Sequence, residues 1–212
     1  MSISRIKDNH LSYKDLLHFC NSHDKPATLY FCNLTKTTKP ISTSIPTMLI
    51  PFSPVLTPTL CRWIRNVDDL VYWSGNTFAG KKFSEQTFLQ HLRNKDISSF
   101  VSLDVNGDLQ AYGEIVRKIN ENRLHLCRII VDPQKRGQGL GKRFCKSLIE
   151  KSRSMGSYKR IMINALSENK PAIACYSSLG FQKIGLRPKA RRIGNRMLDL
   201  VIMSKNLEQQ KK

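Results

Sequence analysis

Residues 131–142 read VDPQKRGQGLGK, and they join an apolar run to an amphipathic one. The run 129–131 has the character of a buried strand, and 142–155 has helical periodicity. Three glycines alternate with other residues in the turn between them. A glycine-rich turn at the start of a helix exposes several backbone N–H groups, and the helix dipole favours negative charge there. The stretch therefore predicts a cradle for a phosphate or pyrophosphate group.

The spacing of these glycines excludes two common nucleotide-binding motifs. A dinucleotide fingerprint needs G-x-G-x-x-G, whereas the spacing here is G-x-G-x-G. A P-loop needs G-x-x-x-x-G-K-[ST], but Arg136 stands where its first glycine belongs and Arg143 follows Lys142. The pattern that fits is R-x-x-G-x-G, from Arg136 through Gly139 to Gly141.

Hydrophobic periodicity and turn residues divide the rest of the chain into elements. The expected strands are 48–52, 100–105, 109–116, 124–131, 158–165, 181–186 and 196–203, and the expected helices are 57–73, 84–92, 142–155 and 169–179. Asn106-Gly107 favours a two-residue hairpin loop, because it supplies the positive φ angles that such a loop needs. Ser84 is the expected N-cap of the second helix.

A second motif follows the glycine-rich stretch. Residues 169–181 carry an asparagine, an alanine, a tyrosine and a Gly-Phe pair at the spacing N-x-x-A-x-x-x-Y-x-x-x-G-F. The two motifs and the order of elements resemble the GNAT N-acetyltransferase superfamily, with Pro171 in place of the first alanine of its signature. The resemblance covers about residues 47–205. It implies an α/β (α+β) fold, with a mixed, mostly antiparallel sheet of about seven strands flanked by about four helices.

The resemblance implies acetyl-CoA as the acyl donor substrate. In the family, the strand before the loop splays from its neighbour and its unpaired backbone groups hold the pantetheine arm, here Ile129, Ile130 and Val131. The loop holds the pyrophosphate, here through Arg136, Gly137, Gln138, Gly139, Leu140, Gly141 and Lys142. Asn169 and Tyr176 complete the expected donor site, although Asn169 also suits a plain N-cap.

Tyr176 is the main catalytic candidate. Acetyl transfer to an amine expels a thiolate, which a nearby phenol can protonate, and the resemblance implies that role for Tyr176. The alternative is an ordinary core tyrosine on an amphipathic helix. Family positions for a general base hold Asn164 and Arg123 here, so Glu114 and then His125 are the remaining candidates, with ordered water as the alternative.

The acceptor site is expected between residues 73–83 and the loop 187–196. Aromatic residues in the first segment suit a pocket wall or the core, and the basic loop suits an acidic acceptor or a solvated hairpin. Lys and Arg total 35 against 16 Asp and Glu, for a net charge of +19. Such a charge favours an anionic partner but is a non-specific signal, because a lysine-rich proteome produces it as well.

The six cysteines form no C-x-x-C pair, which indicates a reducing compartment without a disulfide framework. His18, Cys20, His23 and Cys32 lie close in sequence but match no strong zinc spacing, so we expect no metal. No signal-peptide core or membrane span is visible, which favours a cytoplasmic protein without membrane contact.

The chain is expected to divide into three parts. Residues 1–46 form an N-terminal extension and a Ser/Thr/Pro linker of unknown function, 47–205 the acetyltransferase domain, and 206–212 a polar tail. The oligomeric state stays open between a monomer and a homodimer.

The expected function is transfer of an acetyl group from acetyl-CoA to a primary amine, by direct attack in a ternary complex. The acceptor, a small molecule or a protein, is not identified. One alternative is a non-catalytic module of the same fold that binds acyl-CoA. Another is an acetyltransferase whose acceptor is a ribosomal or nucleic-acid-associated protein amine.

Overall fold

The structure of the protein is a computed structural model, and it describes residues 48–78 and 82–207. The N-terminal extension, including the cysteines and histidines considered for zinc, lies outside the described residues.

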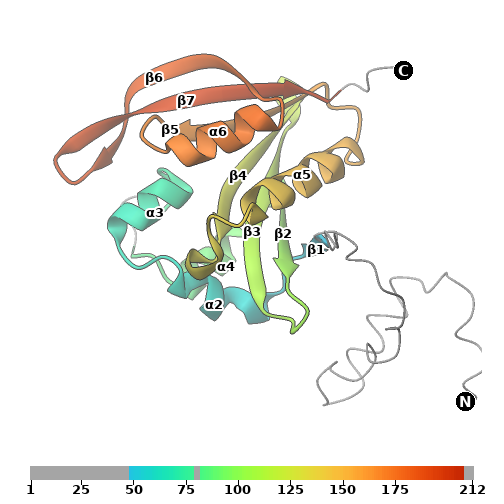
Figure 1. Cartoon of the computed structure of the whole chain (residues 1–212), viewed down its shortest axis with the longest axis vertical. Helices are drawn as coiled ribbons and strands as arrows, with labels where there is room; N and C mark the ends of the chain where they lie inside the picture. The colour runs from blue at the N-terminus through green and yellow to red at the C-terminus, as the bar shows by residue number, and fades with distance from the viewer. Residues whose placement is uncertain (1–47, 79–81, 208–212) are drawn as a thin grey trace, which may run out of the picture. The chain divides into compact units, whose positions relative to one another are not determined.

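A seven-stranded sheet with strand order β1-β2-β3-β4-β5-β7-β6 forms the centre of the domain (Figure 1). Its strands are β1 (Ile50–Pro51), β2 (Ile97–Leu103), β3 (Leu109–Lys118), β4 (Arg123–Val131), β5 (Arg160–Leu166), β6 (Gln182–Ile193) and β7 (Arg196–Asn206). Every neighbouring pair is antiparallel except β4 and β5. The expected mixed, mostly antiparallel sheet is confirmed.

Five α-helices are described: α2 (Thr57–Arg62), α3 (Val67–Ser74), α4 (Glu85–His91), α5 (Leu140–Arg153) and α6 (Lys170–Ser178). The count exceeds the expected four because the helix expected at 57–73 is two helices. The side chain of Asn66 accepts a hydrogen bond from the Asp69 amide at 2.8 Å and caps a new helix there. Ser84 caps α4, as expected, through a capping box with Thr87.

The helices cover the sheet on both faces. On β2, Phe100 packs in one buried cluster with α5 and α6, whereas the next residue, Val101, packs in another with α2, α3 and α4. Neighbouring strand residues point to opposite faces, so the two clusters lie on opposite sides of the sheet. Figure 1 shows α5 and α6 together on one face.

The hairpin between β2 and β3 differs from the expected two-residue loop. Leu103 pairs with Leu109, which leaves a five-residue loop at Asp104–Asp108. The Asp104 side chain accepts from the amides of Asn106 and Asp108 at 3.0 and 2.9 Å, so a side chain closes the loop that Asn-Gly was expected to close alone. Gly107 still supplies a positive φ of 84°. At the other end of the chain, β7 continues through Asn206 and Leu207 is buried, beyond the expected boundary at residue 205.

Candidate active site

Strands β4 and β5 separate halfway along their length. They pair only from Arg123 to Leu126 on β4 and from Arg160 to Ile163 on β5. Beyond this point β5 pairs with β7 alone, while residues 127–131 of β4 pair with β3 alone. Strand pairing therefore leaves the β5-facing backbone groups of residues 127–131 without a partner on β5.

A β-bulge bends β4 at the point of separation. Tyr112 pairs with Ile130 and Glu114 pairs with Cys127, so Arg128 and Ile129 lie opposite the single residue Gly113. Arg128 has a φ of 49°, in the left-handed region that is strained for a residue with a side chain.

Side chains from several elements hold the bulge in place. The Arg128 carbonyl oxygen accepts a hydrogen bond of 2.7 Å from the indole of Trp73 on α3. Its guanidinium donates to Thr77 at 3.1 Å and forms an ion pair with Glu114. The structure thus compensates the backbone strain with hydrogen bonds and one buried ion pair.

Glu114 is fully buried and makes four polar contacts. Besides the ion pair with Arg128, its oxygens accept from the Tyr112 hydroxyl at 2.7 Å and lie 3.1 and 3.2 Å from Nε2 of His91. Burial by itself raises the pKa of the Glu114 carboxyl, but hydrogen bonds from His91 and Arg128 outweigh it and hold the pKa below its ordinary value. The carboxylate is ionised and its oxygens are already engaged.

A groove of about 640 Å³ opens beside the unpaired half of β4. Its walls are Ile129–Val131, the glycine-rich loop and the N-terminal part of α6. The expected donor-site residues all line it except Gln138, whose carbonyl oxygen instead accepts from Arg143 at 3.0 Å.

The glycine-rich loop presents the start of α5 to this groove. Gly137 and Gly139 have φ angles of 79° and 72°, which explains why glycine stands at both positions. The first described hydrogen bond inside the helix runs from the Arg143 amide to the Gly139 carbonyl. The amides of Leu140, Gly141 and Lys142 precede it and are available to an anion, which is the arrangement expected for a pyrophosphate site.

Two thiols also line the groove. Cys145 lies on α5 and Cys175 on α6, next to Tyr176. A hydrogen bond with Cys145 lowers the pKa of the Cys175 thiol to about 7 against the effect of burial, and the charge of Lys142 lowers it further. The pKa of Cys145 is raised by the same hydrogen bond and by burial.

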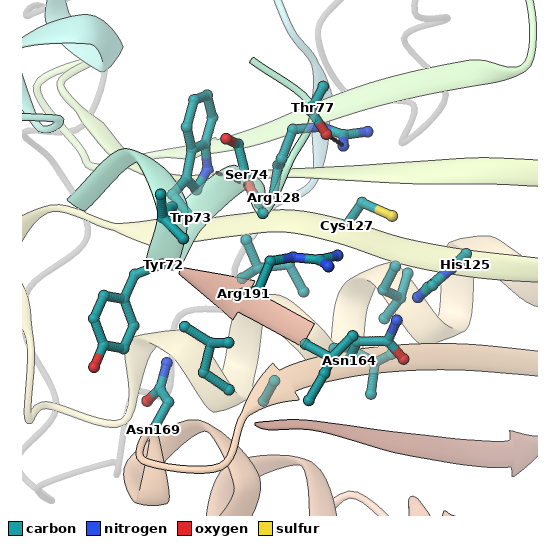
Figure 2. A pocket seen from close by; sticks show the side chains of 18 of the residues that line it. Tyr72, Trp73, Ser74, Thr77, His125, Cys127, Arg128, Asn164, Asn169 and Arg191 are labelled. Atoms are coloured by element: carbon teal, nitrogen blue, oxygen red, sulfur yellow. Dashed lines mark hydrogen bonds between the residues drawn. The ribbon is translucent and has the colours of Figure 1, made fainter. Parts of the chain in front are cut away.

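A second cavity of about 220 Å³ lies where β4 and β5 separate, and residues of both strands and of α3 line it. Figure 2 shows its lining, with Arg191 reaching in among the β4 residues Cys127 and Arg128 and Asn164 of β5. Residues 71–75, Thr77 and Arg191 contribute to it. Arg191 lies on β6, so the segment expected as a loop at 187–196 is strand as far as Ile193. The acceptor region expected from the sequence, between 73–83 and 187–196, thus includes a real cavity.

Tyr176 lines both the groove and the second cavity. The cavities share this residue with Tyr72, Trp73, Ile129 and Asn169. Burial raises the pKa of the Tyr176 phenol well above its ordinary value, so the phenol keeps its proton at physiological pH. A neutral phenol that lines both cavities can donate a proton to the leaving group of a reaction between molecules bound in them.

His125 lines the second cavity, whereas Glu114 lines neither. Burial, with the positive charges of Arg123, Lys118 and Arg128, lowers the pKa of His125 to about 4. The imidazole is therefore neutral at physiological pH and only weakly basic.

Three residues of the site were not singled out by sequence reasoning. Arg128 looks like any surface arginine of a strand, His91 like a helix residue and Gly113 like a strand glycine. A Cβ on Gly113 would lie 2.9 Å from Phe144 and 3.0 Å from Leu148, so this glycine lets α5 approach the bulge. A glycine inside a strand is a recognised sign of close approach, and it was the one available signal.

Within residues 48–78 and 82–207, no helix is long and apolar enough to cross a membrane. The same residues contain no group of three or more metal-ligating side chains placed to bind an ion.

The sequence of this chain is similar to those of known acetyltransferases. The model of the acetyltransferase (GNAT) family matches residues 66–181. N-alpha-acetyltransferase RimI of Mycobacterium tuberculosis is 29% identical over 106 residues, which make up 47% of this chain and 65% of that protein. An L-methionine sulfoximine/L-methionine sulfone acetyltransferase of Pseudomonas aeruginosa is 35% identical over 81 residues, 38% of this chain and 46% of that protein.

Solved structures share the fold at lower identity. The spermidine N-acetyltransferase of Vibrio cholerae, in complex with CoA and spermine, superposes with a TM-score of 0.65 at 19% identity, over 76% of this chain and 95% of that one. Such matches span only 16% to 65% of the curated relatives' own lengths, so this chain is similar to a part of each of those proteins.

Proposed function

The chain belongs to the acetyltransferase (GNAT) family, and we propose that it transfers an acetyl group from acetyl-CoA to a primary amine by direct attack in a ternary complex. Tyr176 carries this proposal, because it lies where the donor groove and the second cavity meet. The pantetheine arm would lie along Ile129–Val131 and the pyrophosphate on the amides that begin α5. The amine would enter from the second cavity, which we call the acceptor cavity.

In this mechanism Tyr176 protonates the departing CoA thiolate. A proton-donating side chain typically contributes ~10²- to 10⁴-fold to a rate. The thioester carbon must lie between the two cavities, so that the amine attacks from one side and the thiolate leaves into the other. Holding both substrates in this geometry supplies a further part of the rate enhancement.

We propose that water in the acceptor cavity takes the proton of the attacking amine. No carboxylate lines this cavity among the described residues, and the engaged Glu114 lies outside it. The neutral His125 can orient such a water. We therefore propose Glu114 as a positioning residue for the β4 bulge rather than as the general base.

The test is a Tyr176→Phe variant, with Tyr158→Phe as the matched control because Tyr158 lines neither cavity. Thiol release from acetyl-CoA is measured with a panel of amines, and acetyl-CoA affinity by calorimetry. We expect a loss of about 100-fold in kcat for Tyr176→Phe with little change in acetyl-CoA affinity, and no loss for the control. Full turnover of Tyr176→Phe would remove Tyr176 from the acid role.

One observation supports a second candidate, a non-catalytic module that binds acyl-CoA. It is the lack of a carboxylate in the acceptor cavity of the described residues. Tight acetyl-CoA binding without thiol release across the whole panel would favour this module. The panel includes N-terminal peptides, because a ribosomal or nucleic-acid-associated protein amine remains an alternative acceptor.

We also propose a cytoplasmic location. The described cysteines are all free thiols, which fits a reducing compartment.

A further inference from the structure

The acceptor cavity contains two arginines with different electrostatic surroundings. Arg128 forms its buried ion pair with Glu114, so its charge is matched. Arg191 reaches in from β6, and no carboxylate of the described residues lies within ion-pair distance of it. The cavity therefore holds one unmatched positive charge.

The guanidinium of Arg191 also has hydrogen-bond donors without a protein partner among the described residues. Its Nη1 donates to the carbonyl oxygen of the neighbouring residue Ala190 at 2.7 Å. Its Nε is buried without a partner in the described part of the chain. Burial, followed by the charge of Arg187, lowers the pKa of the Arg191 guanidinium, as expected for a cation without an anion beside it. A guanidinium held in this state gains strongly from an anion that enters the cavity.

The end of α3 lies directly against this arginine. A Cβ on Gly75 would lie 3.0 Å from Nε of Arg191, and Gly75 has a φ of 60°. Glycine at this position leaves room for the guanidinium at the end of α3. Arg191 thus occupies a built position in the cavity, unlike the exposed Arg187 and Arg192 of the same strand.

A second polar group of the cavity also lacks a partner. Oδ1 of Asn164 is buried without a hydrogen bond from any described residue. An amide oxygen can accept a hydrogen bond from the N–H of a bound amine. An unmatched cation and an unsatisfied acceptor in one cavity complement a molecule that carries both an anion and an amine.

We propose that the acceptor is a small amine that also bears a carboxylate, as a free amino acid does, and that Arg191 is the specificity-determining residue that binds this carboxylate. The proposal rests on the proposed acetyl transfer and names the substrate class of the same site. A polyamine is disfavoured, because its additional positive charges would enter a cavity that already holds an unmatched one.

The kinetic test compares matched acceptors with the full chain and acetyl-CoA. The probes are phenylalanine, methionine and glutamine, each as the free acid, the carboxamide and the decarboxylated amine, together with spermidine and an N-terminal peptide. We expect at least one free acid to exceed its own carboxamide and decarboxylated amine by roughly 30-fold or more in kcat/KM. Equal kcat/KM for the forms that lack the carboxylate, or a higher kcat/KM for spermidine or the peptide, would overturn the proposal.

Variants of Arg191 connect the preference to this residue. Arg191→Gln should raise KM for the free acid by roughly 30-fold, leave KM for acetyl-CoA unchanged and abolish the preference over the carboxamide. Arg191→Lys should retain part of the preference, because it keeps the charge but loses the planar fork. Arg192→Gln removes the same charge from an exposed neighbour that lines neither cavity, and should change nothing. A preference that survives Arg191→Gln would refute the assignment.

A binding measurement separates this inference from the proposed function. N-acetylphenylalanine, N-acetylmethionine and N-acetylglutamine, with their carboxamides, are titrated into the CoA complex by calorimetry. We expect one of the free acids to bind the wild type at least 10-fold more tightly than its carboxamide and to lose that advantage in Arg191→Gln. Absence of any turnover would reject the proposed function alone, whereas absence of Arg191-dependent binding would reject the inference.

Discussion

Replacing Glu114 with glutamine tests whether this carboxylate organises the β4 bulge. Glutamine keeps the shape and can still accept from Tyr112, but it removes the charge that matches Arg128. The Arg128 side chain is only 9% exposed, so the substitution leaves a guanidinium buried without a counter-ion. Breaking a buried ion pair in this way costs about 3–5 kcal/mol of unfolding free energy. For a domain of this size we expect a Tm lower by very roughly 6–20 °C.

The assay is urea unfolding followed by circular dichroism, with Glu121→Gln as the control. The Glu121 side chain is 53% exposed in its pair with Arg123, so the control should change the unfolding free energy by no more than about 0.5 kcal/mol. Adding Arg128→Met to Glu114→Gln removes both charges, and should recover part of the loss because no unmatched charge then remains. Purely additive losses would show that the two side chains do not act as a pair.

The pH dependence of stability gives an independent check on Glu114. Its folded-state pKa lies below the ordinary value of 4.5, so the pair stabilises the fold above that pH and loses its contribution as the pH falls through the folded pKa. The difference in unfolding free energy between wild type and Glu114→Gln should therefore shrink in acid below about pH 4.5. Loss of turnover in Glu114→Gln with unchanged stability would refute this reasoning and restore Glu114 as a candidate base.

Three further predictions concern neighbouring residues. Gly113→Ala should destabilise the fold by about 1–3 kcal/mol, because the added Cβ would lie 2.9 Å from Phe144. Gly185→Ala on β6 is the control and should cost far less, because the nearest atom to its Cβ would lie at 3.7 Å. Equal losses of unfolding free energy in urea would contradict this prediction. Alkylation of Cys175 by iodoacetamide should rise through a midpoint near pH 7 and slow when CoA fills the groove; a midpoint near 9 would count against the thiol pair. Because the pKa of His125 is about 4, kcat/KM should show no inflection near pH 6.5; one that disappears in His125→Gln would make this histidine the base.

Local sequence signals named most of the residues that line the groove. Alternation, turn glycines and caps depend on residues a few positions apart, and they placed most strands, α5 and α6 close to where the structure has them. The exception is β6, which continues to Ile193 through most of the segment that was expected to be a loop. The glycine-rich loop and Asn169–Phe181 each act within one continuous segment, so their residues could be named before the groove was seen. Gln138 is the one expected donor-site residue that does not line the groove, and its carbonyl oxygen accepts a hydrogen bond from Arg143.

Which charges of the second cavity are paired was decided only by tertiary structure. Glu114 was expected as a base because the family positions for one hold other residues and burial raises the pKa of a glutamate. Its partners His91 and Arg128 come from α4 and β4, and only packing brings them together and lowers that pKa instead. Arg191 reaches the cavity over Gly75, more than a hundred positions earlier in the chain. The glycine-rich stretch 131–142 by itself predicted a phosphate or pyrophosphate cradle, because the backbone amides of such a turn lie within one local segment. Only together with the motif at 169–181 did it indicate acyl-CoA as the donor. The charge of the acceptor cavity depends on which distant side chains neutralise one another, and that follows from the folded structure alone.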